Sequence, residues 1–267
     1  MAEPSKKRKG SSSRSQRRFG SQDTPIPPSI SSSTLFSSEE QCIRYTTLFS
    51  SRSIIDPKFM DMEFFSDEMF ECVQAFQNSG LILFVSLKIP VYPELVKVCY
   101  SNLGIQEGSL ISEVYGIKMV IDQSLFFELT QLSSDGVPFE GTLDDDWKFD
   151  FSVFDARRLV CINQADMTRR LLAGSLTFDY RILHYLIVRI LLPRSSKFAQ
   201  FFEEDLIIMW AFLTVCQIDW AHLVRYCMNK ALRSNTPLPN PHLISLFLHH
   251  FEWSPPSVIA KSVMALG

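Results

Sequence analysis

The stretch from residue 181 to 194 constrains the fold more than any other. It reads Arg-Ile-Leu-His-Tyr-Leu-Ile-Val-Arg-Ile-Leu-Leu-Pro-Arg, which is too apolar for an ordinary surface helix. It is also too short, and too interrupted by His184 and Arg189, to cross a bilayer, which needs about 20 apolar residues. Because proline breaks a helix, the segment should end at Pro193. We therefore predict a buried helix at the centre of the fold.

The amino-terminal residues differ in composition from the rest of the chain. Residues 1–34 hold seven basic and two acidic side chains, a net charge of +5, whereas the remainder, with 19 basic and 27 acidic residues, carries −8. The segment is rich in Ser, Lys, Arg and Pro and has too few apolar side chains to offset the chain entropy lost on folding. We predict a disordered basic tail over residues 1–35 and a folded domain over residues 36–267.

Apolar periodicity makes this domain mainly α: an irregular multi-helix globular domain with one small β-hairpin. The hairpin is predicted at Ser109–Val114 and Ile117–Ile121, where two β-prone runs flank Tyr115–Gly116. Residues 133–150, with the acidic run Asp144–Asp146, are predicted to be a loop. Helices are predicted at 38–49, 67–77 with Ser66 as N-cap, 93–102 with Pro93 in the first turn, 122–132, 153–161, 164–173, 178–192, 203–216, 220–233, 240–251 and 256–265.

The tail contains two basic clusters that suit a nuclear-import sequence. Four contiguous basic residues are followed by a second pair, which gives a bipartite-like pattern. These residues are Lys6, Lys7, Arg8, Lys9, Arg17 and Arg18. The pattern predicts a nuclear protein, otherwise a cytoplasmic one, whose tail binds nucleic acid or a protein partner such as an import receptor. The alternative is a tail that only raises solubility.

Six further arginines could form a phosphate-binding face. Two doublets are predicted on neighbouring helices, and two single arginines lie on the central helix: Arg157, Arg158, Arg169, Arg170, Arg181 and Arg189. Clustered guanidinium groups bind nucleic acid through its phosphates. The more common role, and the one we favour, is pairing with carboxylates such as Asp155, Asp166 and Asp179.

Patterns that would indicate an enzyme are missing. The five histidines and six cysteines show no metal-ligand spacing, and no Gly-rich phosphate loop or nucleophile elbow occurs. A two-metal nuclease needs three converging carboxylates, whereas Asp144–Asp146 are contiguous in a predicted loop. We expect no enzymatic activity, no cofactor, no small-molecule substrate and no membrane span.

Several segments together resemble the plant transposon protein domain, an all-helical module of plant retrotransposon-derived reading frames, some of them labelled envelope-like. The resemblance covers roughly residues 36–235. The matching segments are Val91–Val96 leading into Tyr100–Leu103, Val114–Ile117 followed by a helix from Asp122 to Leu132, Tyr180–Tyr185 ending in Leu191–Arg194, and Asp205–Ile218. The family has no established catalytic residues, so the resemblance implies an origin and a fold but no reaction.

These observations favour a non-enzymatic, retroelement-derived module that binds protein or nucleic acid. One alternative is an envelope-like or capsid-associated structural protein of a plant retrotransposon, although no signal peptide, spanning helix or glycosylation site is visible in the sequence. Another alternative is a remnant of a nuclease or integrase.

Overall fold

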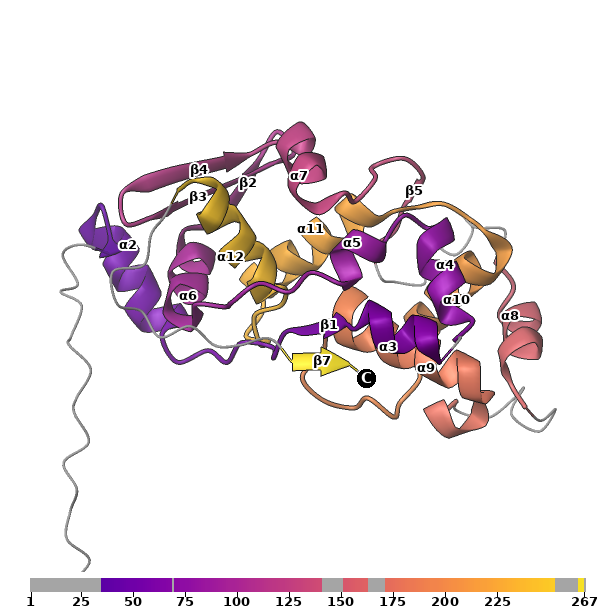
Figure 1. Ribbon diagram of the computed structural model, residues 1–267. Helices are drawn as coiled ribbons and strands as arrows, with labels where there is room; N and C mark the ends of the chain where they lie inside the picture. Colours follow the sequence, from indigo (N-terminus) through magenta and orange to yellow (C-terminus); the bar gives the residue numbers. More distant parts are fainter. Residues whose placement is uncertain (1–34, 69, 141–150, 163–170, 253–263, 267) are drawn as a thin grey trace, which may run out of the picture. The chain divides into compact units, whose positions relative to one another are not determined.

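The computed structural model describes residues 35–68, 70–140, 151–162, 171–252 and 264–266 (Figure 1). The predictions for the basic tail, for Arg169 and Arg170, and for Asp144–Asp146 lie outside these residues. All described residues belong to one unit that covers residues 32–267.

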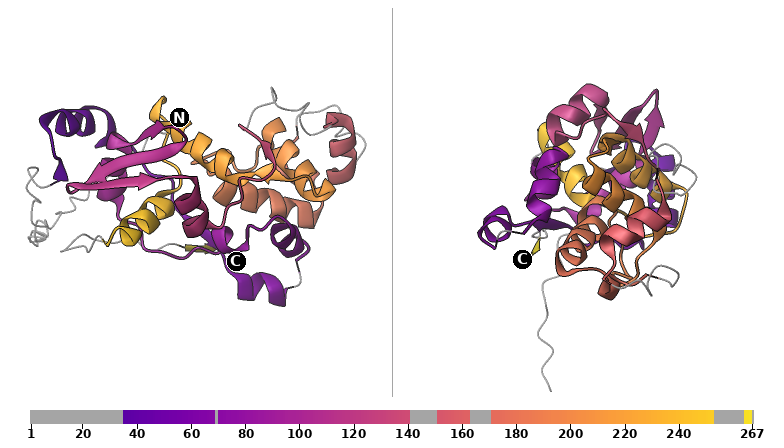
Figure 2. Two further views of the ribbon diagram at one scale, coloured as in Figure 1. Left: turned by 90° about the horizontal axis from the view of Figure 1, so that it is seen from above. Right: turned by 90° about the vertical axis from the view of Figure 1, so that its right-hand side faces the viewer.

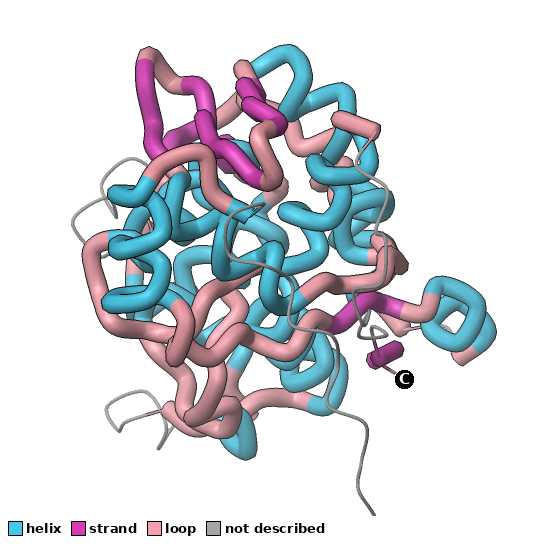
Figure 3. Tube along the Cα trace, turned by 90° about the vertical axis from the view of Figure 1, so that its left-hand side faces the viewer, coloured by secondary structure: helices cyan, strands magenta, loops and turns pink. Residues whose placement is uncertain are grey.

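The described part of the chain is mainly helical, as predicted (Figure 3). Short α-helices alternate with turns throughout. They are α2 (Glu39–Arg44), α3 (Met62–Asp67), α4 (Cys72–Asn78), α5 (Ile82–Val85), α6 (Pro93–Asn102), α7 (Gln123–Thr130), α8 (Val153–Val160), α9 (Phe178–Leu186), α10 (Glu203–Thr214), α11 (Trp220–Leu232) and α12 (Pro241–His250). Two π-helical segments, η1 (Tyr45–Phe49) and η5 (Ile187–Leu191), extend α2 and α9, and η4 (Ala173–Ser175) is a 3-10 turn.

Local sequence signals explain where several helices begin. Pro93 occupies the first turn of α6, where its missing N–H is not needed. The side chain of Asp122 accepts a hydrogen bond from the Leu125 N–H at 2.8 Å and caps α7. Asp219 does the same for the His222 N–H of α11 at 2.7 Å.

The predicted hairpin is present but is part of a larger arrangement. Strands β3 (Ser109–Val114) and β4 (Ile117–Ile121) are antiparallel as predicted, and β2 (Gly104–Gln106) extends them to a three-stranded sheet. Two short parallel pairs were not predicted. They join β1 (Lys58–Met60) to β7 (Met264–Leu266) and β5 (Val137–Pro138) to β6 (Ile218–Asp219). The prediction of one hairpin is therefore corrected to three small sheets among the described residues.

Three predicted elements differ from the structure. The helix expected at 67–77 is split into α3 and α4, because Asp61 caps a helix that already contains Ser66. Residue 172 is extended and pairs with Gln200, so the end of the predicted helix 164–173 is wrong. The end of the predicted helix 256–265 forms β7 instead, because residues 264–266 pair with β1. In each case a cap or a long-range pairing prevails over local periodicity.

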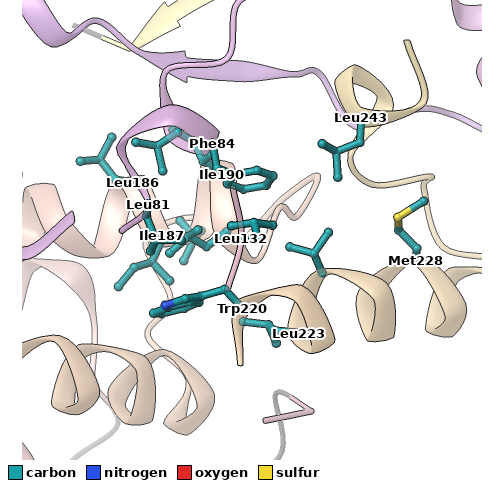
Figure 4. Packing of buried hydrophobic residues seen from close by; sticks show 14 of the residues in the cluster. Leu81, Phe84, Leu132, Leu186, Ile187, Ile190, Trp220, Leu223, Met228 and Leu243 are labelled. Carbon is teal, nitrogen blue, oxygen red and sulfur yellow. The ribbon is translucent and has the colours of Figure 1, made fainter. Parts of the chain in front are cut away.

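One apolar core lies beneath these elements. Leu81, Leu132, Ile187 and Trp220 converge from four separate parts of the chain, and Figure 4 shows their side chains meeting. Segment 181–194 is at the centre of this core, since Leu186, Ile187, Val188, Ile190 and Leu191 are all buried. The central buried helix is thus confirmed. Helices α9 and α10 pack against each other on the side of the described unit away from α2 (Figure 2).

Candidate functional site

Two polar residues of segment 181–194, His184 and Arg194, contact the buried carboxylate of Asp205 on α10. His184 and Asp205 are each 1% exposed, and His184 Nε2 lies 3.2 Å from Asp205 Oδ2. Arg194 donates to Asp205 Oδ1, and the Phe202 N–H donates to Oδ2 at 2.9 Å. Burial acts to raise the pKa of Asp205, but the hydrogen bonds from His184, Arg194 and Phe202 outweigh it, so the pKa of Asp205 falls below its ordinary value. This network ties segment 181–194 to the start of α10.

A cavity of about 250 Å³ adjoins this network. Arg194, Lys230, Glu140, Glu204 and Tyr226 are among its lining residues. The lining carries charges of both signs, and Glu140 pairs with His222 at 3.5 Å. Burial raises the pKa of Cys227, another lining residue, to about 11, which keeps this thiol protonated near neutral pH. The cavity therefore offers no thiolate nucleophile from Cys227.

Metal ligands do not gather in the described residues. Within them no group of three His, Cys, Asp or Glu side chains could hold a metal ion. No helix among the described residues has both the length and the apolar character needed to cross a membrane.

The structure brings together some of the arginines that the sequence grouped. The bridge between Cys161 and Leu176 brings the end of α8, which carries Arg157 and Arg158, beside the start of α9 and Arg181. Arg189 lies about two helical turns beyond Arg181. Arg169 and Arg170 are outside the described residues.

Three of these arginines have partners within the fold. Arg158 pairs with Asp155 at 3.5 Å, and Arg181 donates to the carbonyls of Ala173 and Leu176, each at 3.2 Å. The guanidinium of Arg189 lies 3.5 Å from the ring centroid of Phe198. Arg157 is half-buried on α8 and also has a partner. The phosphate-binding face stays a prediction, but these contacts agree with a packing role.

A line of three phenylalanines, of which the two outer ones are exposed, is a stronger candidate for a functional surface. The line begins at Phe64 of α3, passes through Phe70 between α3 and α4, and ends at Phe178 of α9. The ring centroids of Phe64 and Phe70 are 6.1 Å apart, and those of Phe70 and Phe178 are 6.2 Å apart. Phe64 is 40% and Phe178 is 63% exposed, while Phe65 beneath them is buried. We call Phe64, Phe70 and Phe178 the aromatic row. Large exposed apolar groups that touch one another are typical of binding surfaces.

Carboxylates flank Phe64 and Phe70 along the chain. Glu63, Asp67, Glu68 and Glu71 are all exposed, and we call these four residues the acidic rim. Their carboxylates make no ion pair or hydrogen bond with any described residue. Between Lys58 and Lys88 the sequence contains no basic residue. The α3–α4 side of the aromatic row therefore carries acidic but no basic side chains, while on α9 Arg181, one turn after Phe178, is held by the Ala173 and Leu176 carbonyls.

A small groove lies next to the aromatic row, between α4 and α9. Its volume is about 100 Å³, and Cys72, Leu183 and Leu213 line it together with Glu71 and Asp179. Burial, with the nearby Asp179 carboxylate, raises the pKa of Cys72 to about 11, so this lining thiol is uncharged at neutral pH. The groove has apolar side chains between two acidic residues.

Sequence reasoning missed this surface because its parts are more than 100 residues apart in the chain. Phe64 and Phe70 come from the segment around α3, whereas Phe178 begins α9. The available signal was the absence of Lys and Arg from residues 59–87, beside a cluster of phenylalanines.

Comparison with known proteins gives no relative on which to base a function. No family model matches the chain, and no curated protein or solved structure matches it either. The resemblance to the plant transposon protein domain therefore remains a hypothesis based on the sequence segments quoted above.

Proposed function

We propose that this chain is a non-enzymatic interaction module of retroelement origin, in which the helical body binds a protein partner and the basic tail binds nucleic acid. The observation that carries the protein-binding part is the exposed aromatic row on α3 and α9. The retroelement origin rests on the sequence resemblance over residues 36–235.

Energetics support a protein partner at this surface. Phenylalanine rings 40% and 63% exposed leave apolar area in water, and covering it releases about 25 cal/mol for each Å². Aromatic residues are enriched among the few that dominate binding energy at protein interfaces. Two rings that already contact Phe70 also lose little side-chain entropy on binding.

The arginines of the body support assigning nucleic acid to the tail. Arg158, Arg181 and Arg189 are engaged with a carboxylate, two backbone carbonyls and an aromatic ring. The positive charge of the chain is concentrated in residues 1–34, and the remainder carries −8. A polyanion is attracted to the former and repelled by the average field of the latter.

Affinity capture from cells tests the protein-binding part. The variant Phe64→Ser/Phe178→Ser should lose a defined set of co-purifying proteins. Phe154→Ser is a matched control, because Phe154 on α8 is also 63% exposed but is not in the aromatic row. If the Phe64→Ser/Phe178→Ser variant retains the same proteins as the control, the proposal fails.

Salt-dependent binding to double-stranded DNA and RNA tests the tail. A variant with Gln at Lys6, Lys7, Arg8, Lys9, Arg17 and Arg18 should lose most of the affinity and most of its salt dependence. If the affinity and its slope with salt are unchanged, the body binds through its own arginines. If the wild-type chain does not bind, the nucleic-acid part of the proposal is wrong.

A further inference from the structure

The charge and spacing of the aromatic surface indicate what kind of partner it fits. We infer that the aromatic row and acidic rim bind a basic amphipathic helix, with apolar side chains on one face and Lys or Arg beside them. This inference rests on the proposed function, because it names the chemistry of the protein partner expected at that surface.

Ring spacing is the first argument. The centroids of Phe64, Phe70 and Phe178 are 6.1 and 6.2 Å apart. Along an α-helix, residues three or four positions apart lie about 5–6 Å from each other on one face. A partner helix with apolar residues at i, i+4 and i+7 can therefore place one of its three anchors against each ring of the row.

The groove between α4 and α9 gives such an anchor a place to insert. It is lined by Cys72, Leu183 and Leu213, which present no charge at neutral pH. Its volume of about 100 Å³ suits a single apolar side chain rather than a whole ligand. Glu71 and Asp179 line the same groove, so a basic residue next to the inserted side chain would meet carboxylates.

Charge complementarity identifies the partner as basic. Glu63, Asp67, Glu68 and Glu71 are exposed and make no ion pair with the described residues. No Lys or Arg lies between residues 59 and 87 to compensate them, and Arg181, one turn after Phe178 on α9, is engaged with the Ala173 and Leu176 carbonyls. An acidic partner would place like charges together, which disfavours association, whereas a basic partner gains attraction and a faster encounter.

Fluorescence anisotropy of the full chain with a labelled peptide tests the inference. The probe is an amphipathic helix of about 15 residues, with Leu at i, i+4 and i+7 and Lys beside them. Two comparison peptides carry Glu in place of Lys, or Ser in place of Leu. The basic peptide should bind, and its affinity should fall as salt is added. Both comparison peptides should bind at least about tenfold more weakly.

Protein variants locate the binding site. Glu63→Gln/Glu68→Gln/Glu71→Gln should weaken peptide binding about tenfold, since three exposed charge pairs each contribute modestly. Phe178→Ser should weaken it about tenfold or more. The matched control is Glu40→Gln/Glu107→Gln/Glu128→Gln, which removes three exposed glutamates from other elements and should bind as the wild type does. Circular dichroism shows whether each variant is folded.

Several results would overturn the inference. They are no binding of the basic peptide, equal binding of the Glu-containing peptide, or equal loss of affinity in the control variant. Sedimentation that shows a dimer lost in the Glu63→Gln/Glu68→Gln/Glu71→Gln variant would also overturn it, in favour of a second copy of this chain.

The proposed function is judged separately. If affinity capture depends on Phe64 and Phe178 but not on the acidic rim, the surface binds protein and the inference of a basic partner is wrong. If affinity capture depends neither on Phe64 and Phe178 nor on the acidic rim, while the basic peptide still binds, the surface can bind a basic helix but captures no partner in cells. The protein-binding part of the proposed function is then wrong.

Discussion

The buried Asp205 network provides a sharp test of how this fold is held together. Asp205→Asn keeps one side-chain oxygen for the Phe202 N–H but removes the negative charge that His184 and Arg194 share. The new amide N–H₂ also faces groups that donate. Removing one partner of a buried charged network costs about 3–5 kcal/mol, compared with about 5–15 kcal/mol for the whole stability of a typical domain.

Urea unfolding followed by tryptophan fluorescence measures this change. With a slope near 3 kcal/mol per molar urea, the midpoint should fall by about 1–1.7 M. Glu203→Gln is the control, because Glu203 is an exposed neighbour in the first turn of α10. In an Arg194→Met background Asp205→Asn should cost less, by about 1–3 kcal/mol, because the two residues interact directly.

The pH dependence follows from the direction of the Asp205 shift. Its pKa is lower in the folded than in the unfolded chain, so its stabilisation is present above about pH 4 and lost as the pH falls through the folded pKa. The Asp205→Asn variant should lack this loss. A midpoint within about 0.3 M of the wild type, together with unchanged acid sensitivity, would refute the view that the network stabilises the fold.

Three other predictions follow from single features. Burial lowers the pKa of His242 to about 4, so its contribution to the free energy of unfolding should be complete above pH 6.5 and fall by up to about 3 kcal/mol towards pH 4. Urea midpoints of the wild type, measured at a series of pH values, should show this decrease, and those of His242→Leu should not. Gly136 has φ +121° and a Cβ there would meet the Gln217 carbonyl oxygen at 2.6 Å, so Gly136→Ala should cost at least about 1–3 kcal/mol in thermal or urea unfolding, and an unchanged midpoint would contradict this. Residues 1–20 fused to a fluorescent reporter should accumulate in the nucleus, and retention in the cytosol would contradict the import sequence.

Local signals were enough to predict much of the helical structure. Pro93 at the start of α6 and Asp122 before α7 specify helix beginnings within a few residues of sequence. The β3–β4 hairpin matches its prediction residue for residue, since Tyr115 and Gly116 both have positive φ and form the tight turn between two β-prone runs. Apolar density alone located the buried segment around Ile187.

Long-range contacts were beyond this kind of reasoning. Strands β5 and β6 contain two residues each and pair across about 80 residues of chain, so neither carries a periodic pattern. The aromatic row depends in the same way on packing that brings Phe178 beside Phe70. The sequence between Lys58 and Lys88 contains no basic residue, but only the fold shows which aromatic side chains remain exposed there.

The parallel pairing of β1 with β7 also has a consequence for synthesis. Phe59 and Met60 of β1 lie opposite residues about 200 positions later in the chain, Ala265 and Leu266. At about 5–20 residues per second, a ribosome needs roughly 10–40 s to produce that partner. During this interval β1 is an apolar strand without its partner, which can pair with a strand of another nascent chain. We expect chaperone demand in the cell to depend on how quickly the ribosome reaches residue 266.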